Sequence, residues 1–165
     1  MKFLYAESIF SNRFNLVDFK KLLGEKPKIS ETNPLEIFER LEREGGKGFL
    51  RPQQERVLTR WNEKFVDRKD TIVKLHTGQG KTLVGLLMLQ SNLNAGYGPV
   101  VYLCTDKYLV KQTIEEAKSF GIRIVEFSEG GATPLAFSNS EAILVTTCHK
   151  LFNGKPVVKR GMTTD

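Results

Sequence analysis

The chain contains at residues 75–82 the sequence Leu-His-Thr-Gly-Gln-Gly-Lys-Thr, which separates a short apolar run from a longer one at residues 83–89. Glycine accepts positive φ angles and lets the backbone approach a ligand closely, as a sharp loop around an anion requires. A helix that begins at Lys81 directs its unpaired first N–H groups and its positive dipole end at such an anion. This stretch therefore predicts a phosphate-binding loop between a strand and a helix.

The residues of the loop suit a nucleoside triphosphate with Mg²⁺. Lys81 reaches the β and γ phosphate oxygens, and the Thr82 hydroxyl is suited to coordinate Mg²⁺, so we expect these two residues to serve catalysis. The other expected phosphate-binding residues are His76, Thr77, Gly78, Gln79 and Gly80. The alternative is an ordinary strand-turn-helix joint with Lys81 in solvent.

Around the loop, short apolar runs alternate with helical stretches. Strands are predicted at residues 71–75, 100–104, 122–127 and 142–146, with helices at 81–94 and 108–120 between them. This order predicts an α/β fold with a mostly parallel sheet and flanking helices. The helix at 81–94 is apolar almost all round, so we expect it to be covered on both sides.

The first 48 residues are rich in polar residues and read as a short helical segment. One helix is predicted around residues 16–23, and a second begins at Pro34 with Asn33 as its cap. Leu35, Phe38 and Leu41 give the second helix an apolar stripe. After a glycine-rich break, a third helix is predicted at residues 51–61.

Composition sets broad limits. The chain has 165 residues, 40% hydrophobic and 27% charged, which is typical of one soluble globular domain. Its net charge of +6 is only weak evidence for a polyanionic partner, because the basic residues are scattered along the chain. Cys104 and Cys148 follow apolar runs and are expected to be reduced, in the cytoplasm. No apolar run approaches the roughly 20 residues of a membrane span, so we expect no membrane anchor.

The loop lacks the first glycine of the strict Gly-x-x-x-x-Gly-Lys-Ser/Thr pattern, because Leu75 stands there. In this form it resembles motif I of the superfamily-2 helicases and translocases, the DEAD/DEAH-like group. The resemblance implies an incomplete RecA-like domain at residues 49–155, with ATP and Mg²⁺ as cofactors and DNA or RNA as partner. Upstream, Arg51-Pro-Gln-Gln resembles the family's Arg-x-x-Gln element, which assigns adenine recognition to Gln54, or else to Gln53.

Two downstream segments also resemble this family. Residues 100–112 are similar to motif Ia, which implies contacts from Thr105 and Lys107 to the nucleic-acid backbone. Residues 143–152 are similar to its Thr-Thr element, which implies a contact from Thr146, or else from Thr147. A strand followed by a capped helix is the alternative for the first segment, and threonine is common in strands.

The chain contains no Asp-Glu-x-His sequence, the family's acidic motif that positions Mg²⁺ and the attacking water. The candidates for a substitute are Asp106, after the apolar run 100–104, and Glu126, after the run 122–125. His76 and His149 form no metal cluster. We therefore expect the ATP-binding front portion of a helicase, a hydrolase by family, that hydrolyses ATP poorly without the missing remainder of the helicase.

Residues 156–165 match no part of the family pattern and are expected to form a tail. If neighbouring strands are missing, unpaired sheet edges make the chain marginally stable. Two other functions stay open. One is a different P-loop enzyme, such as a small kinase or GTPase, and the other is a non-catalytic nucleotide-binding interaction module.

Overall fold

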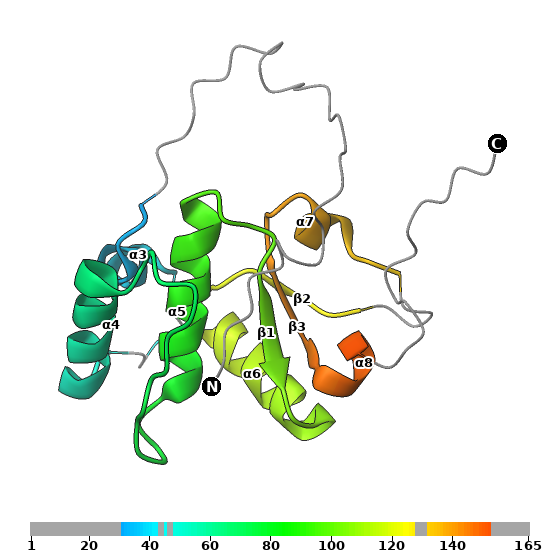
Figure 1. The fold of residues 1–165 in the computed structure, drawn as a ribbon. Coiled ribbons are helices and arrows are strands. Elements are labelled where there is room, and N and C mark those ends of the chain that lie inside the picture. Colours follow the sequence, from blue (N-terminus) through cyan, green and yellow to red (C-terminus); the bar gives the residue numbers. More distant parts are fainter. Residues whose placement is uncertain (1–30, 43–44, 46–47, 128–131, 153–165) are drawn as a thin grey trace, which may run out of the picture.

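Helices and strands alternate from residue 81 onwards (Figure 1). The computed structural model describes residues 31–42, 45, 48–127 and 132–152. The helices are α3 (Pro34–Arg40), α4 (Pro52–Lys64), α5 (Lys81–Asn94), α6 (Lys107–Ser119), α7 (Leu135–Ser138) and α8 (Cys148–Phe152). The strands are β1 (Val101–Cys104), β2 (Ile124–Val125) and β3 (Ile143–Thr147). The predicted helix around residues 16–23 and the predicted tail at 156–165 lie outside the described residues.

The described strands form one sheet in the order β1–β3–β2, and both neighbouring pairs are parallel. Tyr102 lies opposite Val145, and Ile124 lies opposite Ile143. Parallel strands need crossover connections, and α6 and α7 lie in the connections between these strands. The predicted α/β class is confirmed, with a small parallel sheet and flanking helices that agree with part of a RecA-like domain.

Alternate residues of the strands face two separate apolar clusters. On one face, Tyr102 and Val145 join the larger cluster, to which α3, α4, α5 and α6 also contribute. On the other face, Val101 and Leu144 pack with Phe137 of α7. Successive side chains of a strand point to opposite faces, so the sheet is covered on both sides.

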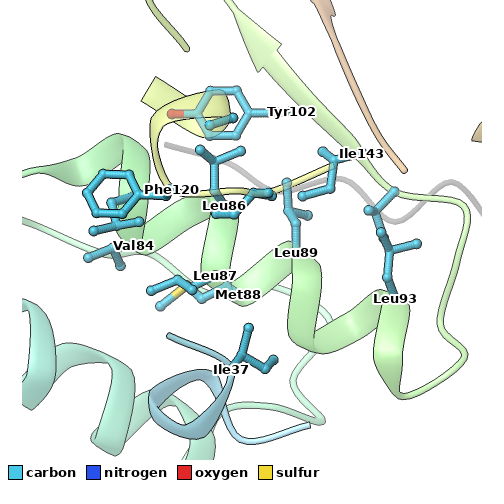
Figure 2. Close-up of a cluster of buried hydrophobic side chains, with 14 of the residues drawn as sticks. Ile37, Val84, Leu86, Leu87, Met88, Leu89, Leu93, Tyr102, Phe120 and Ile143 are labelled. Atoms are coloured by element: carbon cyan, nitrogen blue, oxygen red, sulfur yellow. The ribbon is translucent and has the colours of Figure 1, made fainter. Parts of the chain in front are cut away.

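Helix α5 lies between the sheet and α3. Leu86 points towards Tyr102 of the sheet, whereas Met88 lies on the side of the helix that faces Ile37 of α3 (Figure 2). All residues from Leu83 to Leu89 are buried. This confirms the prediction that α5, which is apolar almost all round, is covered on both sides, here by the sheet and by α3. It also fixes the start of α5, where the phosphate loop ends.

Helix α3 begins as its sequence predicts. The Oδ1 atom of Asn33 accepts a hydrogen bond of 3.1 Å from the N–H of Leu35, and Pro34 occupies the first turn. Ile37 and Phe38 of α3 are buried in the same cluster as α5. The division of the chain at residue 48 stays a prediction.

The predicted strand at residues 71–75 is wrong, because this segment belongs to no strand. Burial alternates along it as in a strand, yet the Ile72 side chain is 90% exposed. A strand is held by hydrogen bonds to a neighbouring strand. In the described part of the chain, β1 is an edge of the sheet and pairs only with β3. The apolar pattern therefore identifies a segment that could join a sheet, but no backbone pairing holds this segment to the described strands.

Two short helices were not predicted from the sequence. Helices α7 and α8 have 4 and 5 residues, too few to show a helical period. Helix α8 follows β3 directly, and the Thr147 Oγ1 atom accepts a hydrogen bond of 3.3 Å from the N–H of Lys150. Of the helices in the described ranges, none has both the length and the apolar character of a membrane span.

Candidate nucleotide site

The phosphate loop turns through two glycines with positive φ angles, 79° at Gly78 and 69° at Gly80. Gly80 is also the N-cap of α5, and no side chain caps this helix end. A Cβ atom on Gly80 would lie 2.2 Å from the Nε2 atom of Gln54, so the space as well as the backbone angle requires glycine. The sequence thus folds here into a sharp turn that leads straight into a helix.

Lys81 folds back towards the start of the loop. Its Nζ atom donates hydrogen bonds to the carbonyl oxygens of Leu75, at 3.1 Å, and His76, at 3.0 Å. The side-chain oxygen of Gln79 accepts a 3.2 Å hydrogen bond from the backbone N–H of His76. The backbone N–H of Gln79 donates to the His76 carbonyl at 3.3 Å. The Thr77 side chain is exposed. The loop therefore keeps one ammonium group beside its first two carbonyls.

The hydroxyl of Thr82 is hydrogen-bonded to the phenol of Tyr102, which is buried in β1. Burial raises the pKa of Tyr102 to about 12 and outweighs the opposite effect of the Thr82 hydrogen bond. The phenol therefore stays neutral at ordinary pH. Thr82, the residue expected to bind Mg²⁺, is thus connected to the sheet through β1.

Two side chains at the start of α4 contact the carbonyl groups of the phosphate loop. The Nη1 atom of Arg51 donates to the Gly78 carbonyl oxygen. The Nε2 atom of Gln54 donates to the Gly80 carbonyl oxygen at 3.3 Å, and its Oε1 atom accepts from the N–H of Arg51 at 2.9 Å. Gln54 was predicted to be a site residue, whereas no role was predicted for Arg51. The signal was available, since Arg51 is the arginine of the Arg-x-x-Gln element.

A pocket of about 290 Å³ opens beside the loop and the start of α4. It is lined by glycines, aromatic rings and a few polar side chains: Phe38, Gly48, Phe49, Arg51, Gln54, Gly78, Gly80, Leu83, Glu116 and Phe120. The ring of Phe49 is fully exposed at this pocket, and no signal in the sequence singled it out. The pocket therefore places an apolar space next to the predicted phosphate loop.

The donor groups of the site suit a triphosphate with Mg²⁺. The N–H groups of Lys81, Thr82 and Leu83 have no acceptor within the helix, because they belong to its first turn. With the positive end of the α5 dipole and the Lys81 ammonium, they form a site for an anion. The Thr82 hydroxyl oxygen is a hard ligand of the kind Mg²⁺ prefers. Within the described ranges, no three His, Cys, Asp or Glu residues lie close enough to hold a metal ion by themselves.

Of the predicted nucleic-acid contacts, Thr105 and Lys107 are exposed between β1 and the first turn of α6. Asp106 lies between them and caps α6, because its side chain accepts a 2.9 Å hydrogen bond from the N–H of Leu109. This hydrogen bond lowers the pKa of the Asp106 carboxyl. The next residue, Tyr108, is 76% exposed and was not selected from the sequence. An aromatic ring directly after Lys107 was the missed signal.

The two threonines of the Thr-Thr element are buried in β3. Thr146 is 1% exposed, and its Oγ1 atom is buried without a hydrogen-bond partner. Thr147 is also buried, with its Oγ1 atom bonded to the backbone of α8. The structure therefore brings Thr105 and Lys107 to the surface together and keeps both threonines inside.

Both acidic candidates for an Mg²⁺ carboxylate already have another contact. Asp106 caps α6, as described above. The Oε1 atom of Glu126 lies 3.5 Å from the Nζ atom of Lys150, in an exposed ion pair. Neither carboxylate has a contact with Lys81 or Thr82 among the hydrogen bonds and ion pairs described here.

The parallel sheet and the glycine loop at the start of α5 define the class of this domain, a P-loop α/β domain. A family model described as the type III restriction enzyme, res subunit, matches residues 47–162. The chain belongs to this family, whose matching part is a superfamily-2 helicase-like N-terminal domain. Families of this kind comprise ATP-dependent P-loop enzymes of helicase or restriction type. No curated protein and no solved structure matches the chain.

Proposed function

We propose that this chain binds ATP with Mg²⁺ and forms the ATP-binding front portion of a nucleic-acid helicase or translocase of the DEAD/DEAH-like group. The observation that carries the proposal is the phosphate loop, where Gly80 in a left-handed conformation starts the 14-residue helix α5 and Lys81 folds over the loop. Membership of a helicase-like family supports the same assignment.

Each residue of the loop has a role in this proposal. Lys81 exchanges its two carbonyl partners for phosphate oxygens, which carry full negative charge and bind an ammonium more strongly. Thr82 binds Mg²⁺ through its hydroxyl oxygen and keeps its hydrogen bond to Tyr102. His76, Thr77, Gly78, Gln79 and Gly80 form the backbone wall of the phosphate site. When bound, ATP supplies the phosphoanhydride bond whose cleavage drives the motor.

Nucleic acid is proposed to contact the exposed surface at the start of α6. Thr105 and Lys107 offer a hydroxyl and an ammonium to backbone phosphates. The exposed ring of Tyr108 adds a surface on which a base of single-stranded DNA or RNA can stack. Thr146 joins this surface only if β3 or α8 shifts, because Thr146 is buried as described above.

We further propose that residues 1–165 alone hydrolyse ATP slowly, because they contain no Asp-Glu-x-His sequence. Efficient turnover then depends on an acidic motif and a second RecA-like domain in the remainder of a helicase. A cytoplasmic location suits the chain, since Cys104 and Cys148 are free thiols.

The test of nucleotide binding compares Lys81→Ala with Lys118→Ala, a matched control that removes an exposed lysine from the far end of α6. Titration with MgATP is expected to show about ten- to one-hundred-fold weaker binding for Lys81→Ala, because one charge-assisted hydrogen bond to phosphate is lost. The control is expected to bind as the wild type does. Equal affinity of all three proteins would exclude the phosphate loop as the site.

ATP turnover is measured in the same samples with and without single-stranded DNA or RNA. Slow turnover that nucleic acid does not raise is the expected result. Rapid turnover stimulated by nucleic acid would contradict the proposed dependence on a separate acidic motif. Weaker binding of single-stranded DNA by Lys107→Ala than by Lys118→Ala would support the surface at α6, and equal binding would argue against it.

A further inference from the structure

We propose that Tyr102 is a positioning residue of the metal site, because its phenol holds the hydroxyl of Thr82 in the orientation in which the hydroxyl oxygen can bind Mg²⁺. The inference rests on the proposed function and deepens it, since it extends the metal site from the phosphate loop to strand β1. The sequence of the loop, residues 75–82, does not point to this second partner.

Tyr102 is a polar side chain in a strand that is otherwise apolar. Strand β1 has the sequence Val-Tyr-Leu-Cys, and Tyr102 is 7% exposed within the larger apolar cluster. A buried phenol costs free energy unless its hydroxyl has a hydrogen-bond partner. The Thr82 hydroxyl is such a partner. The ring of Tyr102 therefore packs in the core, while its polar end reaches the first turn of α5.

The hydroxyl of Tyr102 lies on the side of α5 where this helix begins. In Figure 2 the ring lies beside Leu86, and its oxygen points along α5 towards the end that carries Val84, away from Leu89. Thr82 is the second residue of α5, two residues before Val84. The side chains of the larger apolar cluster hold β1 and α5 together. The phenol therefore approaches Thr82 from a packed strand and not from a loop.

The hydrogen bond matters because of the way a hydroxyl binds a metal. A threonine in a helix divides between two χ1 rotamers, so its oxygen has no single position by itself. A hydroxyl has one proton and two lone pairs. When a lone pair of the Thr82 oxygen binds Mg²⁺, the proton needs an acceptor, and the phenol oxygen of Tyr102 can accept it. Outer partners of this kind orient a metal ligand and raise the affinity for the metal.

The orientation of Thr82 matters all the more because other protein ligands are scarce. Asp106 caps α6, and Glu126 is paired with Lys150. Within the described ranges, no three His, Cys, Asp or Glu residues lie close enough to hold a metal ion. Mg²⁺ at a nucleotide usually keeps several waters and takes few ligands from the protein. A change at the Thr82 hydroxyl should therefore be measurable in the part of nucleotide affinity that depends on Mg²⁺.

The experiment uses the 165-residue chain and two probes, MgATP and metal-free ATP in the presence of EDTA. Tyr102→Phe removes the phenol oxygen and keeps the packed ring. Tyr97→Phe is the matched control, because Tyr97 is 45% exposed and follows the far end of α5. Thr82→Val removes the hydroxyl and keeps the branched shape, and the double variant Tyr102→Phe with Thr82→Val completes a double-mutant cycle. Circular dichroism shows whether each variant is folded.

Tyr102→Phe is expected to weaken the binding of MgATP about two- to ten-fold, the size of one lost hydrogen bond, and to leave the binding of metal-free ATP unchanged. Tyr97→Phe is expected to bind both probes as the wild type does. In the Thr82→Val background, Tyr102→Phe should have no further effect, because the partner of the phenol is already absent. If Tyr102→Phe fails to fold, the tyrosine Raman doublet of the wild type decides, since it reports the hydrogen bonding of phenols. The doublet should change with MgATP but not with metal-free ATP.

Several results would overturn the positioning role while leaving nucleotide binding intact. Equal weakening of MgATP and metal-free ATP by Tyr102→Phe would mean that the phenol supports the fold of the loop and not the metal ligand. An unchanged affinity for MgATP, or a Raman doublet that MgATP does not alter, would leave the contact without a binding role. An undiminished effect in the Thr82→Val background would assign the phenol to a different group. A wild-type chain that binds neither probe would instead reject the proposed function itself, and the positioning role with it.

Discussion

Two segments that flank α5 in the sequence, residues 71–75 and strand β1, were both predicted to be strands but have different structures. In β1, Val101 to Cys104 pair in register with β3, and alternate side chains enter two apolar clusters. In residues 71–75 burial also alternates, but the segment joins no strand and leaves Ile72 exposed. An apolar pattern therefore shows only that a segment could form a strand. The segment becomes a strand when its backbone pairs with a neighbouring strand.

The position of each segment relative to its neighbours explains the contrast. β3 lies between β1 and β2. It pairs with β1 from Leu144 to Thr147 and with β2 at Ile143 and Leu144, and all five of its residues are buried. Residues 71–75 connect α4 to the phosphate loop, and only Val73 and Leu75 pack partly against the larger cluster. Unpaired segments of this kind are where a β protein is open to pairing with another chain. Three measurements would break or sharpen the comparison.

The largest difference is expected in amide hydrogen exchange. Residues 143–147 are expected to exchange only through opening that approaches global unfolding, because β3 is the central strand and all of its residues are buried. Residues 71–75 are expected to exchange with an opening free energy near zero, since no strand holds them. The experiment follows deuterium uptake by peptide mass spectrometry. Equal protection of the two segments would show that residues 71–75 are paired in solution.

A pair of substitutions is expected to give the next largest effect. Leu144→Ala removes a side chain with 0% exposure from β3, and the free energy of unfolding should fall by about 2–5 kcal/mol. Ile72→Ala truncates an exposed side chain and should change it by no more than about 0.5 kcal/mol. Urea denaturation monitored by circular dichroism gives both values. A comparable loss for Ile72→Ala would place its side chain in a packed core and end the contrast.

The smallest effect concerns the Tyr102 phenol, which links β1 to Thr82 at the end of the phosphate loop. Its pKa is raised from 10.0 to about 12 by burial. Below pH 10 the phenol is protonated in both the folded and the unfolded chain, so its contribution to stability is constant. Between pH 10 and about 12 only the unfolded chain loses the proton, and the free energy of unfolding falls by up to about 1.4 kcal/mol per pH unit.

Tyr102→Phe removes this pH dependence. Wild type is expected to be more stable than the variant at pH 9, because the variant lacks the hydrogen bond to Thr82. The advantage should shrink by about 1.4 kcal/mol at pH 11, where only the unfolded wild type has lost its phenol proton. Urea denaturation at both pH values measures the difference. A constant difference would mean that the phenol is not buried at the junction of β1 and α5.

Local sequence determined much of the fold because the relevant interactions are short in range. Asn33 before Pro34 predicted the start of α3, and the apolar surface of α5 on all sides predicted its cover by both sheet and helix. The strands at residues 101–104, 124–125 and 143–147 were also predicted, with small errors at their ends. These features depend on caps and on side-chain periods that a few neighbouring residues fix.

The candidate site divides in the same way. The sequence of residues 75–82 predicted a loop that ends where α5 begins. This was possible because glycine is the residue that readily adopts the positive φ angles of this turn. They could not reveal that Arg51 and Gln54, 27 and 26 residues before their glycine partners, bond to the loop carbonyls. They also could not reveal the contact between Thr82 and Tyr102, or the burial of Thr146.

The sequence alone thus determined a parallel α/β domain with a glycine turn at the start of α5, since turn angles, caps and apolar periods are local properties of the chain. Only the tertiary structure decided which strand-like segments pair, which polar side chains face the loop and which are buried. Those outcomes depend on contacts between residues far apart in the chain, where the approach of a neighbouring strand or helix determines whether a backbone group or a side chain finds its partner.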